Sequence, residues 1–305
     1  MLDVLIVGGG PAGLSAALVL GRCRRNVVLC DAGRPRNSRS NGVHGFLTRD
    51  GIEPAELRRI GREQLCRYST VRVHEGVVID IDNRHDHFEA MLADGTRMVG
   101  RKLLLAPGIE PDLPSIDGVA ELYGRGVFDC PYCDGWEVRD KPIAVYGQGN
   151  RAKKFALQLF VWSSDVVLCT DGPSDLAEQD KRELEAARVD VVEDRIEKLE
   201  GTGSALSRIS LSNGKSLSHQ ALFFIAGPPK PSPLLRKLGC VPDDRGTVET
   251  GRYESTRVPG LYVAGDASRR VDFAIVAAAE GAMAAFSINR ELLDNSLLRE
   301  DHRSS

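Results

Sequence analysis

The stretch Val-Leu-Ile-Val-Gly-Gly-Gly-Pro-Ala-Gly, residues 4–13, decides the fold. Its four apolar residues predict a buried strand, its glycines predict a tight turn, and the Ala/Leu-rich residues up to about 20 predict a helix. A second apolar run, at 27–30, ends at Asp31. The order strand, glycine turn, helix, strand and acid is typical of a dinucleotide-binding βαβ unit.

Gly8, Gly10 and Gly13 occupy the three glycine positions of this fingerprint. The first permits the tight turn, the second lets a pyrophosphate approach the backbone, and the third lets the helix pack closely on the strand. Phosphates bind at the N-terminus of such a helix, where N–H groups and the helix dipole favour negative charge. Asp31 lies 21 residues after Gly10, where a carboxylate accepts hydrogen bonds from ribose hydroxyls.

The pattern repeats 139 residues later. Residues 143–146 predict another buried strand, and residues 166–169 repeat the Val-Val-Leu-Cys sequence of 27–30. One chain therefore contains two dinucleotide-binding openings in equivalent register. The second set of fingerprint positions holds Gly147, Gly149 and Ala152.

The acid of the second opening is displaced by one residue. Thr170 stands at the position equivalent to Asp31, and Asp171 follows it. A shift of one residue along an extended strand turns the side chain to the other face of the sheet. The second site is therefore a weaker candidate for binding a nucleotide than the first.

The arrangement of these units predicts an α/β protein with two Rossmann-like, three-layer dinucleotide-binding domains, the second inserted in the first. We expect residues 1–118 and 248–305 to form the first domain and residues 119–247 the second. Another short strand, at 261–264, precedes Gly-Asp and a long alanine-rich helix expected from about 273 to 293.

Composition excludes several classes of protein. With 305 residues the chain is long enough for about two domains, and 40 Lys and Arg against 43 Asp and Glu leave no basic field for nucleic acid or an anionic membrane. The apolar run at 4–20 contains four glycines and lacks a basic leading segment, which argues against a signal peptide or membrane span. Seven cysteines in such a chain favour a reducing compartment, and we expect a cytoplasmic protein.

Cys130 and Cys133 form a Cys-Pro-Tyr-Cys motif ahead of the second opening. This spacing closes a small disulfide, and it lowers the thiol pKa so that a thiolate exists near neutral pH. A zinc site needs two further ligands, and the sequence has no second CxxC, so we expect no metal; a structural disulfide is the other alternative. Asp134 follows directly and can exchange the proton of dithiol chemistry if desolvation raises its pKa; a capping or solvated aspartate is the alternative.

Together these features resemble the low-molecular-weight thioredoxin reductase family of flavoproteins, over nearly the whole chain. The motifs that carry the resemblance are both glycine fingerprints, Ala-Pro-Gly at 106–108, Cys-x-x-Cys-Asp-Gly at 130–135, and Gly-Asp at 265–266. The resemblance implies a homodimer with FAD in the first domain. It also implies that Cys133 faces the flavin, Cys130 attacks the substrate disulfide and Asp134 acts as acid and base.

The resemblance also implies how the cofactor is held. Asp266 would bind the ribityl chain, and the final helix would point its N-terminus, near Ala274 and Ile275, at the flavin pyrimidine. The residues thus expected to bind FAD are Gly8, Gly10, Pro11, Ala12, Gly13, Asp31, Ala106, Gly108, Gly265, Asp266, Ala274 and Ile275.

Two departures from the family matter. NADPH-using members carry His-Arg-Arg after the second strand of the inserted domain, where this chain has Thr-Asp-Gly at 170–172. Losing the cations removes charge-assisted bonds to a 2′-phosphate, so we expect NADPH to bind poorly or not at all, with NADH or ferredoxin as alternative donors. The second departure is Asp272-Phe273, where many members have Arg-Gln.

The leading hypothesis is an enzyme that passes electrons through FAD and Cys130–Cys133 to a thioredoxin-like protein. The alternative is a dithiol oxidase, which transfers electrons from a small-molecule or protein dithiol to O₂. That branch of flavoproteins tends to carry His where Asp134 stands, although the residues at 131–132 and 136–137 resemble it more. A flavin-bound redox sensor without turnover is the third hypothesis.

Overall fold

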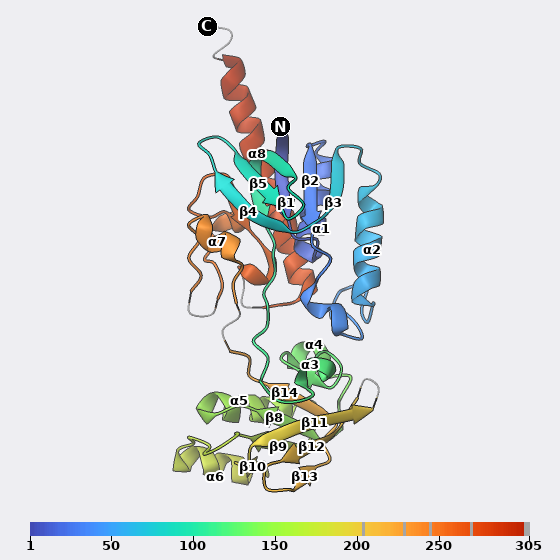
Figure 1. Ribbon diagram of the computed structural model, residues 1–305, viewed down its shortest axis with the longest axis vertical. Helices are drawn as coiled ribbons and strands as arrows, with labels where there is room; N and C mark the ends of the chain where they lie inside the picture. Colours follow the sequence, from blue (N-terminus) through green and yellow to red (C-terminus); the bar gives the residue numbers. More distant parts are fainter. Residues whose placement is uncertain (203–204, 228–229, 244–245, 269–270, 302–305) are drawn as a thin grey trace. The chain divides into compact units, whose positions relative to one another are not determined.

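The computed structural model describes the backbone of residues 1–301 except 203–204, 228–229, 244–245 and 269–270. The chain divides into two compact units (Figure 1). The first comprises Met1–Ser38, Gly45–Glu110 and Pro228–Ser305, and the second comprises Arg39–His44 and Pro111–Gly227.

The first unit contains a seven-stranded sheet with the order β3-β2-β1-β6-β5-β4, in which β15 also pairs with β6. The strands β1, β2, β3, β6 and β15 are parallel, whereas β4, β5 and β6 pair antiparallel. The strands are β1 (Leu2–Val7), β2 (Val27–Asp31), β3 (Val71–Glu75), β4 (Val78–Asn83), β5 (Phe88–Leu92), β6 (Arg97–Leu105) and β15 (Leu261–Val263). The helices are α1 (Pro11–Arg22), η1 (Arg36–Arg39), α2 (Pro54–Leu65), α7 (Pro233–Lys237), η2 (Arg252–Glu254), η3 (Gly265–Ala267) and α8 (Ala274–Asp301).

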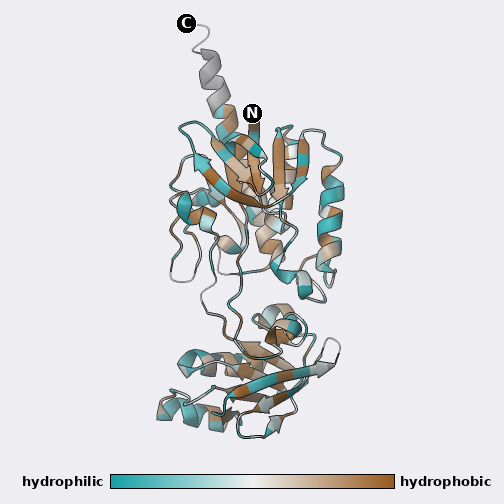
Figure 2. Cartoon of the chain, in the orientation of Figure 1, coloured by the Kyte–Doolittle hydropathy of each residue, from teal (hydrophilic) through white to brown (hydrophobic). Residues whose placement is uncertain are grey.

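Both faces of this sheet are buried. Val4 and Ile6 of β1 lie in one apolar cluster together with residues of α1 and α8. Leu5 and Val7 lie in the other cluster, which includes residues of β4, β5 and α7. Figure 2 shows the same concentration of apolar residues in the sheet. Burial on both faces gives the three-layer arrangement that a near-continuous apolar β1 predicts.

The second unit repeats this architecture on a smaller scale. Its parallel sheet has the order β10-β9-β8-β14-β7, and a separate antiparallel sheet has the order β11-β12-β13. The strands are β7 (Val127–Phe128), β8 (Ile143–Tyr146), β9 (Val166–Cys169), β10 (Asp190–Val192), β11 (Ile196–Thr202), β12 (Ala205–Leu211), β13 (Ser216–Leu217) and β14 (Ala221–Phe224). The helices are α3 (Val119–Leu122), α4 (Pro131–Asp134), α5 (Gly149–Leu159) and α6 (Glu178–Ala186).

The α/β class with two Rossmann-like domains is confirmed. The limits of the compact units differ from the expected domain boundaries. The second unit ends at Gly227 and not at 247, because Leu234 and Leu235 of α7 and Cys240 after it are buried in the core of the first unit. Residues Arg39–His44 also belong to the second unit, where the Arg125 Nε donates a hydrogen bond to the carbonyl of Arg39 at 3.3 Å.

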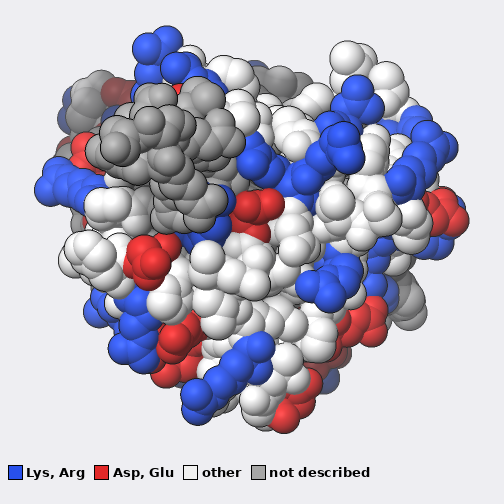
Figure 3. Space-filling view, turned by 90° about the horizontal axis from the view of Figure 1, so that it is seen from above, with Lys and Arg blue, Asp and Glu red and all other residues white. Residues whose placement is uncertain are grey.

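Two surface properties bear on the excluded classes. Within the part of the chain described, no helix combines the length and apolarity that crossing a membrane requires. On the face seen in Figure 3, acidic and basic side chains occur together. This mixing agrees with the near-zero net charge of the sequence.

Candidate functional site

The turn after β1 leaves no room for side chains at three of its four glycines, Gly8, Gly9 and Gly13. Gly8 has a φ of 114°, and a Cβ added there would lie 2.0 Å from the carbonyl oxygen of Ala106. A Cβ added to Gly13 would lie 1.9 Å from the carbonyl oxygen of Gly8. The Gly8 N–H donates to the carbonyl of Cys30 at 2.8 Å and ties the turn to β2. The first and third glycines therefore have the packing roles that the fingerprint predicts.

Gly10 differs from its neighbours because it faces open space. A Cβ added there would have no atom within 4 Å, and Gly10 is the N-cap of α1, which begins at Pro11. The first-turn N–H groups of α1 and this opening suit the diphosphate of a dinucleotide. On the other side of the turn, α8 crosses α1 so closely that a Cβ on Gly281 would lie 1.9 Å from the carbonyl oxygen of Ala12.

Asp31 ends β2 beside this turn and is buried. Its Oδ1 accepts from the Gly33 N–H at 2.8 Å. Its Oδ2 accepts from Arg58 at 2.9 Å and from Arg62, both on α2. A Cβ on Gly9 would lie 2.2 Å from the Asp31 Cγ, so the carboxylate is packed directly against the glycine turn.

Burial alone would raise the pKa of the Asp31 carboxyl. Hydrogen bonds from Arg62, the Gly33 amide and Arg58 outweigh burial and hold this pKa below its ordinary value. Asp31 is therefore a carboxylate at neutral pH, as a ribose acceptor must be. Sequence reasoning missed both arginines, because nothing in their spacing from Asp31 indicates that α2 packs beside β2.

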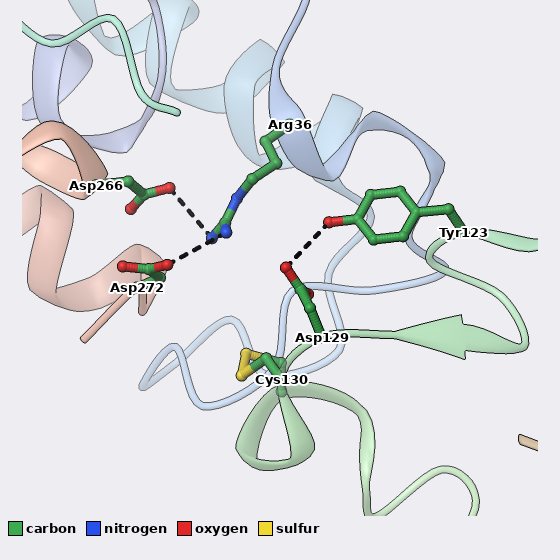
Figure 4. The surroundings of a disulfide bond; sticks show 7 residues. Arg36, Tyr123, Asp129, Cys130, Asp266 and Asp272 are labelled. Atoms are coloured by element: carbon green, nitrogen blue, oxygen red, sulfur yellow. Dashed lines mark hydrogen bonds and ion pairs between the residues drawn. A yellow bond between two sulfur atoms is a disulfide. The ribbon is translucent and has the colours of Figure 1, made fainter. Parts of the chain in front are cut away.

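The second group of predicted cofactor residues lies where β15 ends. Gly265 has a φ of 78°, and its N–H donates to the buried Glu280 of α8 at 2.7 Å. Asp266 pairs with Arg36 at 3.2 Å, and Arg36 also pairs with Asp272 at 3.2 Å (Figure 4). Arg36, from η1, was not predicted. Asp272 is one of the two departures from the family sequence. Its carboxylate shares the Arg36 guanidinium with Asp266.

The other predicted cofactor residues lie in the same unit. Ala106 is buried directly after β6, and Gly108 has a φ of 67° with open space where a Cβ would be. Ala274 and Ile275 form the N-terminus of α8, as predicted, although the helix runs on to Asp301 and not to about 293. The first unit therefore provides a glycine turn, an acid at a strand end and a helix N-terminus that fit FAD.

The second glycine opening differs from the first in its backbone: Gly149 has a φ of 65° and is the first residue of α5, whereas Gly10 has a φ of −79° and is the N-cap of α1. The Gly147 N–H donates to Cys169 at 3.1 Å, matching the bond between Gly8 and Cys30. The Gly149 N–H, however, donates to the carbonyl of Ser174 at 3.1 Å. A backbone group that would face a pyrophosphate is thus already hydrogen-bonded to the loop after β9. Ala152 is fully buried in α5.

Asp171 is also engaged within the second unit. Its Oδ2 accepts from the Tyr146 hydroxyl at 3.1 Å and its Oδ1 accepts from the Ile196 N–H at 3.2 Å. Burial and the nearby Asp171 raise the pKa of Tyr146 to about 12, so the phenol remains a donor. At the position equivalent to Asp31, the Thr170 hydroxyl donates to the carbonyl of Gly172 at 2.7 Å.

The Cys130–Cys133 disulfide is formed, with a Cα–Cα distance of 5.3 Å (Figure 4). Cys130 is the N-cap of α4, and its carbonyl accepts from the N–H groups of Cys133 and Asp134, both at 3.2 Å. All three side chains are partly exposed. Directly before the pair, Asp129 accepts from the Tyr123 hydroxyl at 3.3 Å.

The helix that carries the disulfide is packed against Trp162. A Cβ on Gly135 would lie 2.5 Å from the carbonyl oxygen of Pro131 and 2.8 Å from the Trp162 ring, so only glycine fits there. Tyr132 contacts the same ring edge-on, with centroids 5.6 Å apart. Tyr132 and Trp136 nevertheless leave 67% and 64% of their surface exposed, which places two large aromatic side chains in solvent beside the disulfide.

Of the five remaining cysteines, three are buried and two are exposed. Burial raises the pKa of Cys30 to about 11 and that of Cys169 to about 12. Cys240 is buried as well, whereas Cys23 and Cys66 are exposed thiols. Among the described residues, no three His, Cys, Asp or Glu side chains are grouped so that they could hold a metal ion.

Comparison with known proteins gives one consistent description. A sequence profile for pyridine nucleotide-disulphide oxidoreductases matches residues 2–281. The thioredoxin reductase aclD of Aspergillus oryzae is 29% identical over 307 residues, which cover 96% of each chain. A solved structure described as a putative thioredoxin reductase of Bacillus anthracis has a TM-score of 0.91 and 33% identity, covering 97% of this chain and 100% of that one.

Another relative aligns over a shorter region. A probable thioredoxin reductase of Arthroderma benhamiae is 34% identical over 176 residues. The alignment covers 56% of this chain and 44% of that protein. The chain therefore matches less than half of the length of this relative, but nearly the full length of the two others.

Proposed function

The chain belongs to the pyridine nucleotide-disulphide oxidoreductase family, and on this basis we propose a thioredoxin reductase-like, FAD-dependent enzyme that does not take its electrons from NADPH. We propose a thioredoxin-like protein as its substrate. The observation that carries the proposal is that the Gly149 N–H donates to the carbonyl of Ser174, whereas Gly10 is the N-cap of α1, in a chain with a Cys130–Cys133 disulfide.

The first unit holds FAD in this proposal. The N-terminus of α1 binds the diphosphate beside Gly10, Asp31 accepts from the adenosine ribose, and Asp266 accepts from the ribityl chain. When bound, FAD supplies a carrier that exchanges two electrons with the disulfide. Because Arg36 pairs with Asp266 and Asp272, we propose that this guanidinium keeps both carboxylates oriented beside the flavin.

The two cysteines perform the exchange with substrate. Two electrons and two protons open the Cys130–Cys133 bond. The Cys130 thiolate then attacks the substrate disulfide, forming a mixed disulfide and expelling one substrate thiolate, which takes up a proton. Cys133 attacks Cys130, releases the second substrate thiol and restores the protein disulfide. We propose that Asp134 carries the protons that this sequence exchanges.

The closed second opening supports a donor other than NADPH. The Gly149 N–H already bonds to the Ser174 carbonyl, and both oxygens of Asp171 accept hydrogen bonds from the protein. The loop also lacks arginines at 170–172 for a 2′-phosphate. NADH meets the same closed backbone, so a one-electron carrier such as ferredoxin is the preferred donor to the reductase.

An anaerobic titration tests this proposal. We expect reduced ferredoxin to bleach the flavin absorbance, and NADPH at 1 mM, on the order of the upper range of enzyme KM values, to leave it unchanged. Bleaching by a dithiol but by none of ferredoxin, NADH and NADPH would exclude the reductase direction. Stoichiometric bleaching by NADPH would contradict the proposal. A Cys133→Ser variant should trap a mixed disulfide through Cys130 with the protein substrate.

A dithiol oxidase is the second candidate, and the self-closed Gly149 opening favours it because this reaction needs no nucleotide. A substrate dithiol gives two electrons and two protons to the Cys130–Cys133 disulfide and leaves as a disulfide. FAD held by the first unit would supply the chemistry that passes these electrons and protons to O₂ as H₂O₂. The exposed Tyr132 and Trp136 offer an aromatic surface for such a substrate. Peroxide formed in air, one per dithiol consumed, would identify this activity, and its absence would remove the candidate.

We also propose that the enzyme is a homodimer, as the family resemblance implies. The exposed Phe286 and Met283 of α8 are apolar residues on the long helix that a second copy can cover. Sedimentation of the flavin-loaded protein tests the state directly. A dimer mass is expected, and a monomer at micromolar concentration would contradict it.

A further inference from the structure

We infer that Arg58 and Arg62 are positioning residues for the adenosine half of FAD, because they hold Asp31 in the one orientation that leaves a single acceptor for the ribose. The inference rests on the proposed binding of FAD to the first unit. It concerns α2, a helix that is part of neither the glycine fingerprint nor the strand that ends at Asp31.

The geometry places the two guanidinium groups on one oxygen. Arg58 and Arg62 lie one helical turn apart on α2, and both donate to the Oδ2 of Asp31. Arg62 also donates to Glu75, at the end of β3, at 2.7 Å. The Arg58 and Arg62 side chains are 17% and 29% exposed and that of Asp31 is 6% exposed, whereas Glu75 at the edge of the network is 78% exposed.

Counting acceptor positions then limits what Asp31 can do. A carboxylate oxygen accepts about two hydrogen bonds. The Oδ2 already has two donors, and it faces the glycine turn, where a Cβ on Gly9 would lie 2.2 Å away. The Oδ1 has one, from Gly33. One position on Oδ1 is therefore left, and it suits one ribose hydroxyl.

Charge gives a second reason for the pair of arginines. Asp31 adjoins a turn that is proposed to receive a diphosphate, and an isolated carboxylate there would repel it. The charges of Arg58 and Arg62 balance those of Asp31 and Glu75. The network thus presents an oriented acceptor without net negative charge.

The adenosine half can be tested separately, because FMN carries the same isoalloxazine and ribityl phosphate without adenosine. Full-length protein freed of flavin is titrated with FAD and with FMN, and flavin fluorescence reports each Kd. We expect Arg58→Gln and Arg62→Gln to weaken FAD about tenfold, on the order of one lost charge-assisted bond, and FMN less than twofold. Arg58→Lys and Arg62→Lys keep the positive charge but not the forked guanidinium group. Their Kd values for FAD should lie between those of the unaltered protein and the Gln variants.

Arg59→Gln is the matched control. Arg59 lies between the two on the same helix but pairs with Glu56 and Glu63 on the exposed side. Arg59→Gln should change neither the Kd for FAD nor the Kd for FMN. Equal weakening of FAD and FMN in the Arg58 and Arg62 variants, or no weakening of either, would overturn the inference. Failure of the unaltered protein to bind FAD would instead overturn the proposed function.

Discussion

The two glycine openings of this chain share a hydrogen bond to the strand that follows but differ in backbone conformation. Gly8 and Gly147 donate to the equivalent cysteines Cys30 and Cys169. A Cβ added to either Gly10 or Gly149 would meet open space, but the Gly149 N–H donates to the loop that follows β9. The difference teaches that a fingerprint establishes a fold and a turn, while the availability of its N–H groups depends on a loop some twenty residues further along.

The largest expected effect comes from exchanging the third fingerprint residue between the openings. Gly13→Ala places a Cβ 1.9 Å from the Gly8 carbonyl oxygen, so we expect a loss of about 4 kcal/mol in unfolding free energy and of bound flavin. Ala152→Gly, its counterpart, should cost only about 1 kcal/mol, the helix propensity difference. Urea unfolding followed by flavin absorbance measures both. Equal losses would show that the two turns are equally constrained.

The acid of the first opening should matter more to stability than that of the second. Asp31→Asn removes the partner of two arginines and should cost about 3 kcal/mol at pH 7, as breaking a buried charge pair does. Because the folded pKa of Asp31 is lowered, its contribution exists above the unfolded pKa near 4 and is lost as pH falls through the folded value.

Unfolding curves of the flavin-free protein between pH 3 and pH 7 measure this effect. The difference between the unaltered protein and Asp31→Asn should shrink as the solution becomes more acidic. Thr170→Ala is the control in the second opening, because its hydroxyl is an uncharged donor. A constant Asp31 difference at every pH would contradict the assignment.

Ligand-dependent hydrogen exchange should distinguish the openings directly. FAD is expected to slow amide exchange in the first turns of α1 at least tenfold, because its diphosphate accepts from those N–H groups. NADPH at 1 mM, about a saturating level for typical nucleotide enzymes, should change exchange at Gly149 less than twofold, since that N–H already bonds to Ser174. Strong protection of Gly149 by NADPH would remove the contrast between the openings.

The smallest effect is expected at His219, just before β14 in the second unit. Burial lowers its pKa, and both of its ring nitrogens are inaccessible and without a hydrogen-bond partner. The unfolded chain takes up a proton near pH 6.5 while the folded protein stays neutral, so unfolding free energy falls as pH drops below that value. His219→Gln should flatten this dependence between pH 7 and pH 5. An unchanged slope would assign the effect to another group.

Much of the site followed from local pattern. The strands, the glycine turns, the CxxC motif and the start of α8 all depend on residues close in sequence, where side-chain alternation and backbone φ limit the conformations available. Arg36, Arg58 and Arg62 were missed because charged residues in short helices are typical of an exposed surface. The boundary at Gly227 was missed because α7 joins the first core through contacts distant in sequence.

The sequence by itself determined that the chain has two dinucleotide folds, a Cys-x-x-Cys pair and no arginines at 170–172 for a 2′-phosphate, because each of these is a matter of residue type and spacing. Only the tertiary structure decided which backbone and side-chain groups beside the two openings are already hydrogen-bonded. The Gly149 N–H is satisfied by Ser174, and the Asp31 carboxylate is held by α2, through hydrogen bonds between segments that the chain brings together only when it folds. A hydrogen bond depends on the distance and angle between its donor and acceptor, and neither quantity can be read from the sequence alone.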